Sequence, residues 1–221
     1  MVTQADLESE EYLKLELGKL VPEAAFWAEE SGKSGDAEYH WVIDPLDGTT
    51  NFARGLPYFC ISVALTKNNK PILGAIYQPV TEELFIAAQG LGAFCNGVRL
   101  DITALNSIHA SVPVVIGLPF AYVDYYQTVV QKFKKMTRKH CVVRSSGAAA
   151  LDSAYAAAGS IDIVFFEKLG WWDIAAGVIL ITEAGGIISD FSGKPITPES
   201  TRYIGGSKST YETFYQLIKK P

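Results

Sequence analysis

The sequence has little cysteine and no long apolar run. Its 221 residues include three widely spaced cysteines, Cys60, Cys95 and Cys141, without a Cys-x-x-Cys pair. An odd number in this arrangement is not a disulfide framework and favours a reducing compartment. The longest apolar tract, 112–123, is interrupted by two prolines and is shorter than the roughly 20 residues that a bilayer-spanning helix needs. Because the first residues also lack the basic and apolar segments of a signal peptide, we expect a cytoplasmic protein with no membrane partner.

Basic residues are in deficit as well. Lys and Arg number 19 against 24 Asp and Glu, which gives a formal net charge of −5 and a pI of about 5.3. This balance argues against a protein that binds nucleic acid through bulk electrostatics, so no nucleic-acid partner is expected. A hydrophobic content of 48% with only 19% charged residues excludes a disordered chain.

The hydrophobic pattern of the first half predicts one helix followed by a β meander. The helix is expected over 5–20, where five apolar residues at helical spacing would face the core: Leu7, Tyr12, Leu13, Leu17 and Leu20. A buried strand at 41–43 is expected to stop at Asp44-Pro45. Further strands are expected at 59–65, 72–77, 83–88 and 93–100, with turns at 67–71 and 96–97.

The second half of the chain alternates between helix and strand. Helices are predicted over 124–138, 148–158, 173–184 and near 208–219, and strands over 142–144, 161–166, 187–190 and 203–204. Mixed sheets packed with helices fit both halves, so an α+β fold is expected. We expect a single domain, 1–221, with an α+β half at 1–110 and an α/β half at 111–221.

The most informative stretch, Trp41–Phe52, has the sequence WVIDPLDGTTNF. Two carboxylates, Asp44 and Asp47, follow a buried strand, and Pro45 restricts the backbone between them. Carboxylates grouped without imidazole or thiol are the ligands that a hard cation such as Mg²⁺ prefers. An Asp-Gly turn followed by threonine helix caps explains the same residues, so this motif alone leaves both interpretations open.

Two further acidic positions favour the metal interpretation. Glu29 follows an apolar run and precedes Asp44 by 15 residues, a spacing that fits two adjacent strand ends joined by a loop. Asp173 opens the predicted helix over 173–184, in front of small residues that permit close approach. Taken alone, Glu29 is explained by a solvated acidic turn and Asp173 by a helix N-cap.

Together these motifs resemble the inositol monophosphatase family. WVIDPLDGTTNF is similar to its first signature, WDIAAGVILITEAGG from Trp172 onward to its second, and FWAEES from Phe26 onward to its upstream acidic motif. Further similarity covers 74–100, 144–159 and 161–167, and hence nearly the whole chain. The resemblance implies a layered α/β/α/β/α sandwich, of the inositol monophosphatase and fructose-1,6-bisphosphatase type, and a Mg²⁺-dependent phosphomonoesterase.

The resemblance also implies roles for individual residues. Two or three Mg²⁺ ions would be bound by four carboxylates and one backbone carbonyl: Glu29, Asp44, Asp47, Asp173 and Leu46. The catalytic residues would be Glu29, Asp47 and Thr49, with Glu29 and Thr49 orienting the attacking water. Contacts to the phosphate or the alcohol are implied for Gly48, Thr49, Thr50, Gly147, Ala148, Ala149, Glu167 and Asp173. Phosphoryl transfer of this kind needs charge neutralisation and an in-line water, without a covalent intermediate.

The reaction implied is hydrolysis of a sugar-alcohol phosphate, with inositol 1-phosphate as the expected substrate. Fructose 1,6-bisphosphate, adenosine 3′,5′-bisphosphate and histidinol phosphate are alternatives, because the metal motif does not select the alcohol. A regulatory or binding protein with the same fold and little catalysis is the alternative from another class. The family also leads us to expect lithium sensitivity and a homodimer.

Two features depart from the family pattern. The chain begins almost at VTQAD, so the usual first helix and its mobile loop are expected to be missing, which would expose apolar surface. The link from Glu167 to Asp173 is one residue shorter than usual. The resemblance therefore fixes the role of Glu167 less firmly than those of the proposed metal ligands.

Overall fold

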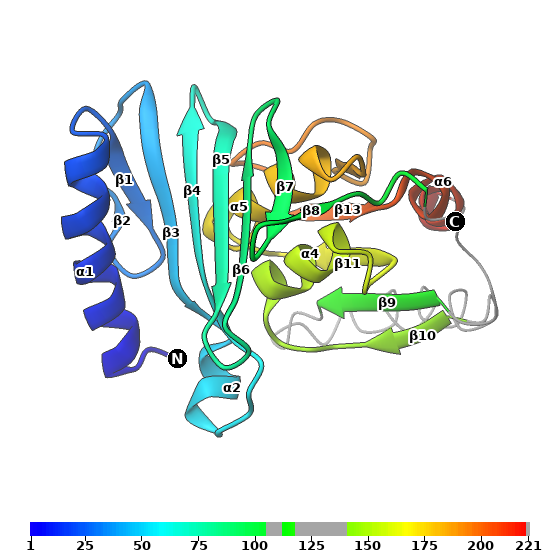
Figure 1. Cartoon of the computed structure of the whole chain (residues 1–221), viewed down its shortest axis with the longest axis horizontal. Coiled ribbons are helices and arrows are strands. Elements are labelled where there is room, and N and C mark those ends of the chain that lie inside the picture. Colours follow the sequence, from blue (N-terminus) through cyan, green and yellow to red (C-terminus); the bar gives the residue numbers. More distant parts are fainter. Residues whose placement is uncertain (105–111, 118–140, 220–221) are drawn as a thin grey trace.

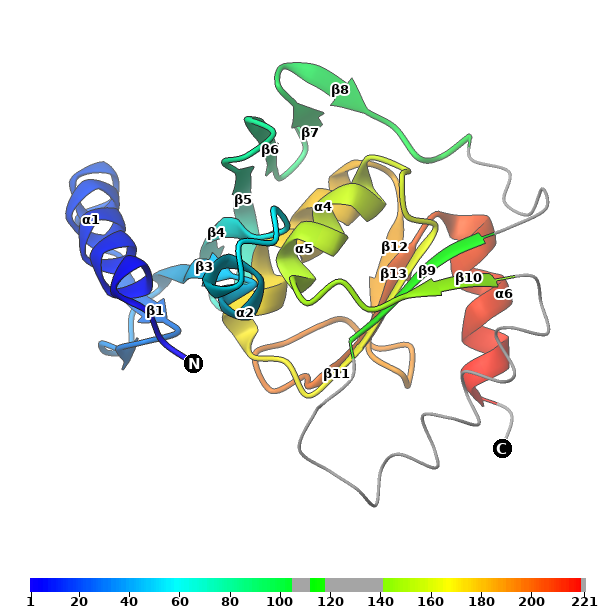
Figure 2. The same ribbon diagram turned by 90° about the horizontal axis from the view of Figure 1, so that it is seen from below.

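Two β-sheets alternate with three layers of helices in the structure, a computed structural model that describes residues 1–104, 112–117 and 141–219. Helix α1 (Gln4–Leu20) covers one face of an eight-stranded sheet. Helices α4 (Ala149–Ala157) and α5 (Trp171–Glu183) lie between this sheet and a five-stranded sheet, and α6 (Lys208–Lys219) packs beyond the second sheet (Figure 1, Figure 2). The α+β class and the layered α/β/α/β/α order are confirmed.

The eight-stranded sheet is built by the first half of the chain in the order β2-β1-β3-β4-β5-β6-β7-β8. Its strands are β1 (Ala25–Ala28), β2 (Gly32–Lys33), β3 (Tyr39–Asp47), β4 (Cys60–Lys67), β5 (Lys70–Gln78), β6 (Glu83–Ala88), β7 (Gly92–Cys95) and β8 (Val98–Leu100). β1 and β3 pair in parallel, and their neighbours pair antiparallel. The predicted meander is confirmed, including turns at Asn68-Asn69 and Asn96-Gly97 with positive φ.

The five-stranded sheet has the order β10-β9-β11-β13-β12. Its strands are β9 (Val112–Gly117), β10 (Cys141–Arg144), β11 (Ile163–Glu167), β12 (Ile187–Ser189) and β13 (Arg202–Gly206). The helix predicted at 124–138, and most of the region around the predicted division near 110, lie outside the described residues. Among the residues that are described, no helix is both long and apolar enough to cross a membrane.

The buried face of α1 differs from the predicted apolar stripe. Three of the five predicted core residues have at least half of their surface exposed: Leu7, Tyr12 and Leu20. Leu13 and Leu17 do pack against the sheet. The other buried positions are acidic, because Asp6 and Glu10 turn toward the loops at the ends of β1 and β3. The prediction was wrong at these three residues because it treated every acidic side chain of the helix as solvated.

Close packing of small residues fixes α5 between its neighbours. On β5, a Cβ atom at Gly74 would lie 2.6 Å from Ile179 Cγ2 and 3.0 Å from the Ala176 carbonyl oxygen. On α5 itself, a Cβ at Gly177 would lie 2.5 Å from Ser153 Cβ on α4. The absence of side chains at these glycines lets α5 approach both the first sheet and α4. These two close contacts position α5, and hence its first turn near β3.

We expect Gly74→Ala to destabilise the protein by about 1–3 kcal/mol, since the added methyl group overpacks the β5–α5 contact. The measurement is urea unfolding followed by circular dichroism. Gly35→Ala is the matched control, because Gly35 is exposed and a Cβ there meets nothing within 4 Å. Equal stability of the two variants would contradict the packing argument.

Candidate active site

Three aspartates converge where β3 ends and α5 begins. Asp44 and Asp47 lie in the last part of β3, and Asp173 lies in the first turn of α5. One carboxylate oxygen from each residue lies within 4.8 Å of the others. Asp44 and Asp47 are buried, and Asp173 is half-buried. The structure therefore brings together residues from two of the sequence motifs that lie in opposite halves of the chain.

A bulge in β3 puts Asp44 and Asp47 on the same side of the sheet. Asp44 pairs with Ser62 and Asp47 with Cys60, so three steps along β3 oppose two steps along β4. Without the extra residue, side chains three positions apart would point to opposite faces. The prediction that the strand stops at Asp44-Pro45 was wrong, because pairing with β4 resumes after the bulge that contains Pro45.

Asp47 is anchored at the N-terminal end of α4. Its Oδ1 accepts the Ala149 N–H at 3.1 Å, and its Oδ2 accepts those of Ala150 and Leu151 at 2.7 and 3.3 Å. Burial and the charge of Asp152 raise the pKa of Asp47 to about 7, while the three backbone hydrogen bonds oppose that rise. A carboxylate at this end of a helix is also favoured by the helix dipole.

Asp173 is fixed by the start of its own helix. α5 begins at Trp171, with Gly170 as N-cap, so the predicted start at Asp173 was two residues late. The Asp173 carboxylate accepts the Gly170 N–H at 2.6 Å from the third helical position, and not as the N-cap residue. Burial and the nearby Asp47 raise the pKa of Asp173 well above its usual value.

Glu29 adjoins the three aspartates from the end of β1. Because β1 and β3 are parallel, Ala28 lies opposite Ile43, and the next residue on each strand is acidic. The Glu29 N–H donates to the Ile43 carbonyl oxygen at 3.0 Å, and its carboxyl group shares a hydrogen bond with that of Asp44. Burial raises the pKa of Glu29, and the contact with Asp44 partly offsets this. The predicted juxtaposition of two strand ends is confirmed.

The turn after β3 presents Gly48 and Thr49 at the start of the short helix α2 (Thr49–Ala53). Gly48 has φ +92°, and a Cβ there would lie 3.0 Å from the Tyr58 carbonyl oxygen, so glycine is required. The Thr49 hydroxyl lies 3.0 Å from the Leu46 carbonyl oxygen and 3.2 Å from Asp6 Oδ1. Thr50 follows in the same helical turn and is exposed.

Asp6 is a site neighbour that the sequence reasoning missed. It is fully buried, and its second carboxylate oxygen accepts the N–H and the hydroxyl of Thr3 at 2.8 and 2.5 Å. The Thr-x-x-Asp spacing of a capping box was the available signal. It would have placed Asp6 at the start of the helix but not beside Thr49, which is 43 positions away in sequence.

The predicted substrate residues of the 147–149 segment adjoin Asp47 at the start of α4. Ala148 and Ala149 are buried, and the N–H of Ala149 is donated to Asp47. Gly147 has φ +84°, and a Cβ there would lie 3.3 Å from Asn51 Nδ2. That amide nitrogen donates to the Ser146 carbonyl oxygen at 2.9 Å. The 147–149 segment therefore contacts Asp47 and helix α2 in this structure.

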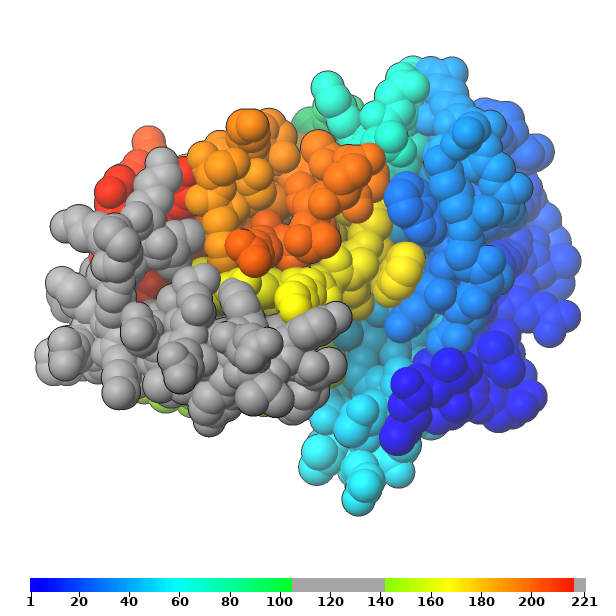
Figure 3. Space-filling model, turned by 180° about the vertical axis from the view of Figure 1, so that it is seen from behind, coloured from blue at the N-terminus to red at the C-terminus, as the bar shows by residue number. Residues whose placement is uncertain are grey.

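Glu167 lies at the end of β11, before the connection to α5 that is exposed between the two halves of the molecule (Figure 3, yellow). It is buried, and its Oε2 forms an ion pair with Arg202 Nε on the neighbouring strand at 3.3 Å. Burial raises the pKa of Glu167 to about 7, although Arg202 and Lys168 oppose the rise. The structure thus places Glu167 in a pair across β11 and β13.

The aspartate cluster lacks a basic partner within the described part of the chain, where the ion pairs of Lys and Arg involve other acids. Burial, followed by repulsion from Asp47, Glu29 and Asp173, raises the pKa of Asp44 well above its usual value. Converging carboxylate oxygens of this kind suit a hard divalent cation, which would supply the missing positive charge. The residues present fit such a metal.

Comparisons with known proteins point to one family. The inositol monophosphatase family matches residues 1–220. An inositol-1-monophosphatase of Mesorhizobium japonicum is 36% identical over 222 residues, covering 100% of this chain and 83% of that protein. A fructose-1,6-bisphosphatase/inositol-1-monophosphatase of Thermotoga maritima is 38% identical over 220 residues, with coverage of 100% and 83%.

Relatives with another kind of name are equally similar. The Nus factor SuhB of Pseudomonas aeruginosa is 36% identical over 224 residues, covering 99% of this chain and 82% of that protein. The crystal structure of the extragenic suppressor protein suhB from Bartonella henselae superposes with a TM-score of 0.92 at 35% identity, covering 99% of this chain and 84% of that one.

The five-layered fold is that of a class of phosphatases. The chain belongs to the inositol monophosphatase family. The resemblance inferred from the three sequence motifs is thereby confirmed.

The variant Asp44→Asn tests whether repulsion among the carboxylates lowers the unfolding free energy of the protein. The amide retains the hydrogen bond from the Leu46 N–H, which is 3.0 Å in the wild type, and can still meet Glu29. Because the pKa of Asp44 is raised on folding, the folded protein keeps a proton that the unfolded chain loses above about pH 4. The unfolding free energy of the wild type therefore falls as the pH rises from there toward the raised pKa.

At pH 8 without divalent cations, we expect Asp44→Asn to be more stable than the wild type, because the amide removes a charge that burial and the neighbouring carboxylates disfavour. Mg²⁺ should stabilise the wild type by mass action and the variant much less. Urea unfolding at several pH values measures both effects. Asp36→Asn, at an exposed aspartate paired with Lys33, should change neither, and a less stable Asp44→Asn at pH 8 would contradict the repulsion.

Proposed function

We propose that this protein is a Mg²⁺-dependent phosphatase that hydrolyses a phosphate monoester of a sugar alcohol, namely inositol 1-phosphate to inositol and phosphate. The observation that carries the proposal is the convergence of Asp44, Asp47 and Asp173, joined by Glu29, beside the Gly48–Thr49 turn. Membership of the family and the names of the Mesorhizobium and Thermotoga relatives support the choice of substrate.

Two or three Mg²⁺ ions would be held by the four carboxylates and the Leu46 carbonyl. Bound there, the ions would neutralise phosphate charge and lower the pKa of a water molecule. The chain's own contribution is to aim the carboxylate oxygens, since each aspartate accepts at least one backbone N–H: from Leu46, from Ala149 to Leu151, or from Gly170.

Glu29 and Thr49 would orient the attacking water. The proton of the Thr49 hydroxyl is directed to the Leu46 carbonyl or to Asp6, so its oxygen is left to accept a hydrogen bond from water. The Glu29 carboxylate supplies a second acceptor. A water that donates to both groups presents its lone pair toward the phosphorus, which is the geometry that an in-line attack requires.

The first turn of α2 would receive the phosphate. The first helical hydrogen bond there runs from the Phe52 N–H to the Gly48 carbonyl oxygen, so the N–H groups of Gly48, Thr49 and Thr50 precede it and suit an anion. Asp173 would contact the substrate as well as the metal. Glu167 would reach the alcohol, with Gly147, Ala148 and Ala149 forming the adjoining wall.

Two alternatives have support from particular relatives. The name of the Thermotoga protein favours fructose 1,6-bisphosphate as a second substrate. The name of the Pseudomonas protein favours a regulatory role in which the fold is retained and catalysis matters less. A cytoplasmic location, lithium sensitivity and a homodimer complete the proposal. An apolar hollow of about 230 Å³ lies on β5–β7 and includes Leu73, Ile86 and Leu91. An apolar surface of this kind is one that a dimer buries.

A substrate panel with and without Mg²⁺ tests the reaction. We expect phosphate release from inositol 1-phosphate only with Mg²⁺, and slower release from fructose 1,6-bisphosphate, adenosine 3′,5′-bisphosphate and histidinol phosphate. Asp47→Asn should remove activity, because the amide both loses a charge and presents N–H groups to the donors of α4. An active Asp47→Asn enzyme would refute the mechanism. A wild-type protein that hydrolyses no ester of the panel would favour the regulatory alternative.

The role of the Thr49 hydroxyl is tested by two substitutions of similar size. Thr49→Val removes the hydroxyl, and we expect kcat to fall by about 10²–10⁴, the range attributed to positioned proton-transfer groups. Thr49→Ser keeps the hydroxyl and should retain most of the activity. Steady-state kinetics at saturating Mg²⁺ measures both, and equal kcat values for the two variants would exclude this role.

A further inference from the structure

One edge of α1 carries four polar residues that contact the loops of the candidate site. Asp6, Ser9, Glu10 and Lys14 have helical spacing and therefore share one face. Asp6 contacts Thr49, the Ser9 hydroxyl donates to the Pro45 carbonyl oxygen at 3.0 Å, and Glu10 and Lys14 reach the loop after β1. The helix thus contacts both strand ends that supply the carboxylates.

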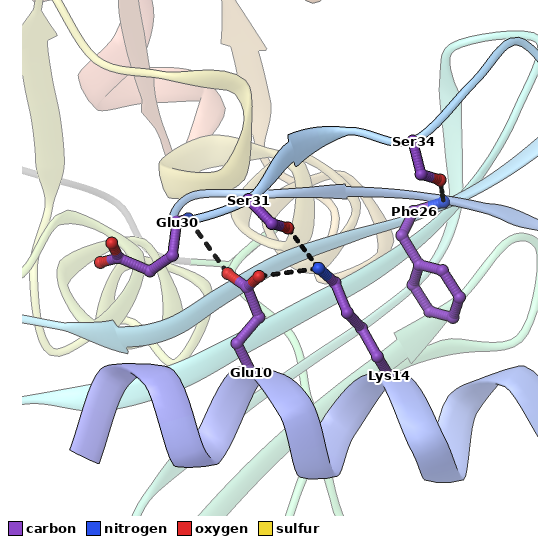
Figure 4. Close-up of polar contacts among 6 residues, drawn as sticks. All are labelled: Glu10, Lys14, Phe26, Glu30, Ser31 and Ser34. Carbon is purple, nitrogen blue, oxygen red and sulfur yellow. Dashed lines mark hydrogen bonds and ion pairs between the residues drawn. The ribbon is translucent and has the colours of Figure 1, made fainter. Parts of the chain in front are cut away.

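Glu10 and Lys14 reach from α1 to the two residues that follow Glu29, which are Glu30 and Ser31 (Figure 4). One oxygen of Glu10 accepts the Glu30 N–H at 3.0 Å, and the other is paired with Lys14 Nζ at 2.8 Å. The same Lys14 ammonium group donates to the Ser31 hydroxyl. Glu10 is only 5% exposed, whereas Lys14 keeps 27% of its side chain exposed, so a buried acceptor is paired with an ammonium group at the surface.

The backbone N–H groups of Glu29 and Glu30, which flank the Cα of Glu29, donate hydrogen bonds to different elements. The Glu29 N–H donates to the Ile43 carbonyl oxygen on β3 at 3.0 Å, and the Glu30 N–H donates to Glu10 on α1. Fixing both amides restricts the backbone at Glu29, and hence the direction in which its carboxylate leaves the chain. Without Glu10, only the β3 side of this restraint would remain.

Glu10 is charged in this environment. Burial raises its pKa, but hydrogen bonds from Lys14, Ser31 and the Glu30 N–H outweigh burial, so that the pKa of Glu10 is lowered overall. A charged acceptor forms a stronger hydrogen bond to a backbone N–H than a neutral one. This matches a group whose task is to hold a loop in one position.

We propose that Glu10 and Lys14 are positioning residues that set the direction of the Glu29 carboxylate toward Asp44. This inference rests on the proposed function, in which Glu29 binds metal and orients water. Residues that orient a metal ligand typically change metal affinity or activity by about 10–100-fold when they are replaced.

The experiment compares four proteins with the wild type. Glu10→Ala removes the acceptor, Glu10→Gln keeps a neutral acceptor, and the double variant Glu10→Lys with Lys14→Glu keeps an ion pair but places no acceptor at the Glu30 N–H. Glu16→Ala is the matched control, because Glu16 lies on the same helix and pairs with Lys19 at 2.6 Å on its exposed side. The readouts are exchange of the Glu30 amide by NMR, Mg²⁺ affinity by calorimetry without substrate, and kcat.

We expect Glu10→Ala to speed Glu30 amide exchange, because the N–H loses its acceptor. Mg²⁺ binding should weaken by about tenfold, with kcat falling more than KM changes. Glu10→Gln should retain most of the wild-type values, and the double variant should behave like Glu10→Ala. Wild-type amide exchange and Mg²⁺ affinity in the double variant would overturn the proposal. So would a Glu10→Ala protein that matches Glu16→Ala in both measurements. A wild type that hydrolyses no ester would refute the proposed function, while the amide exchange would still decide the role of Glu10.

Discussion

Repulsion among buried carboxylates is the constraint on which the site depends. Asp44, Asp47 and Asp173 lie together without a basic partner in the described residues, and burial disfavours the charge of each. Such a group persists only where the surrounding backbone holds it. The structure meets this need with N–H donors from three separate elements, two of which are the starts of helices α4 and α5.

The helix starts therefore serve two purposes at once. Their N–H groups need acceptors because no intrahelical carbonyl is available to them, and the aspartates need donors because they are buried. Small residues make the match geometrically feasible: alanines at the start of α4 let Asp47 reach three consecutive amides, and Gly74 lets α5 approach the sheet. Packing and electrostatics consequently constrain the same few residues.

Much of this arrangement could be predicted from the sequence. The strands of the meander have clear turn residues, and two of the carboxylate motifs identified the aspartates that the fold brings together. The bulge in β3 was not predictable, because a proline after an apolar strand normally indicates its end. The buried role of Asp6 and Glu10 was missed because their partners, Thr49 and Glu30, lie far along the chain, and local periodicity gives no information on such contacts.

The position of the aspartates along the chain has a further consequence. Asp44 and Asp173 are about 130 residues apart, and closing a loop of that length costs conformational entropy that grows only slowly with its size. A single cation shared by the two would act as a removable cross-link between the halves of the fold. Removing it would release a constraint comparable in kind to opening a disulfide, in a protein in which Cys60 and Cys95 are free thiols.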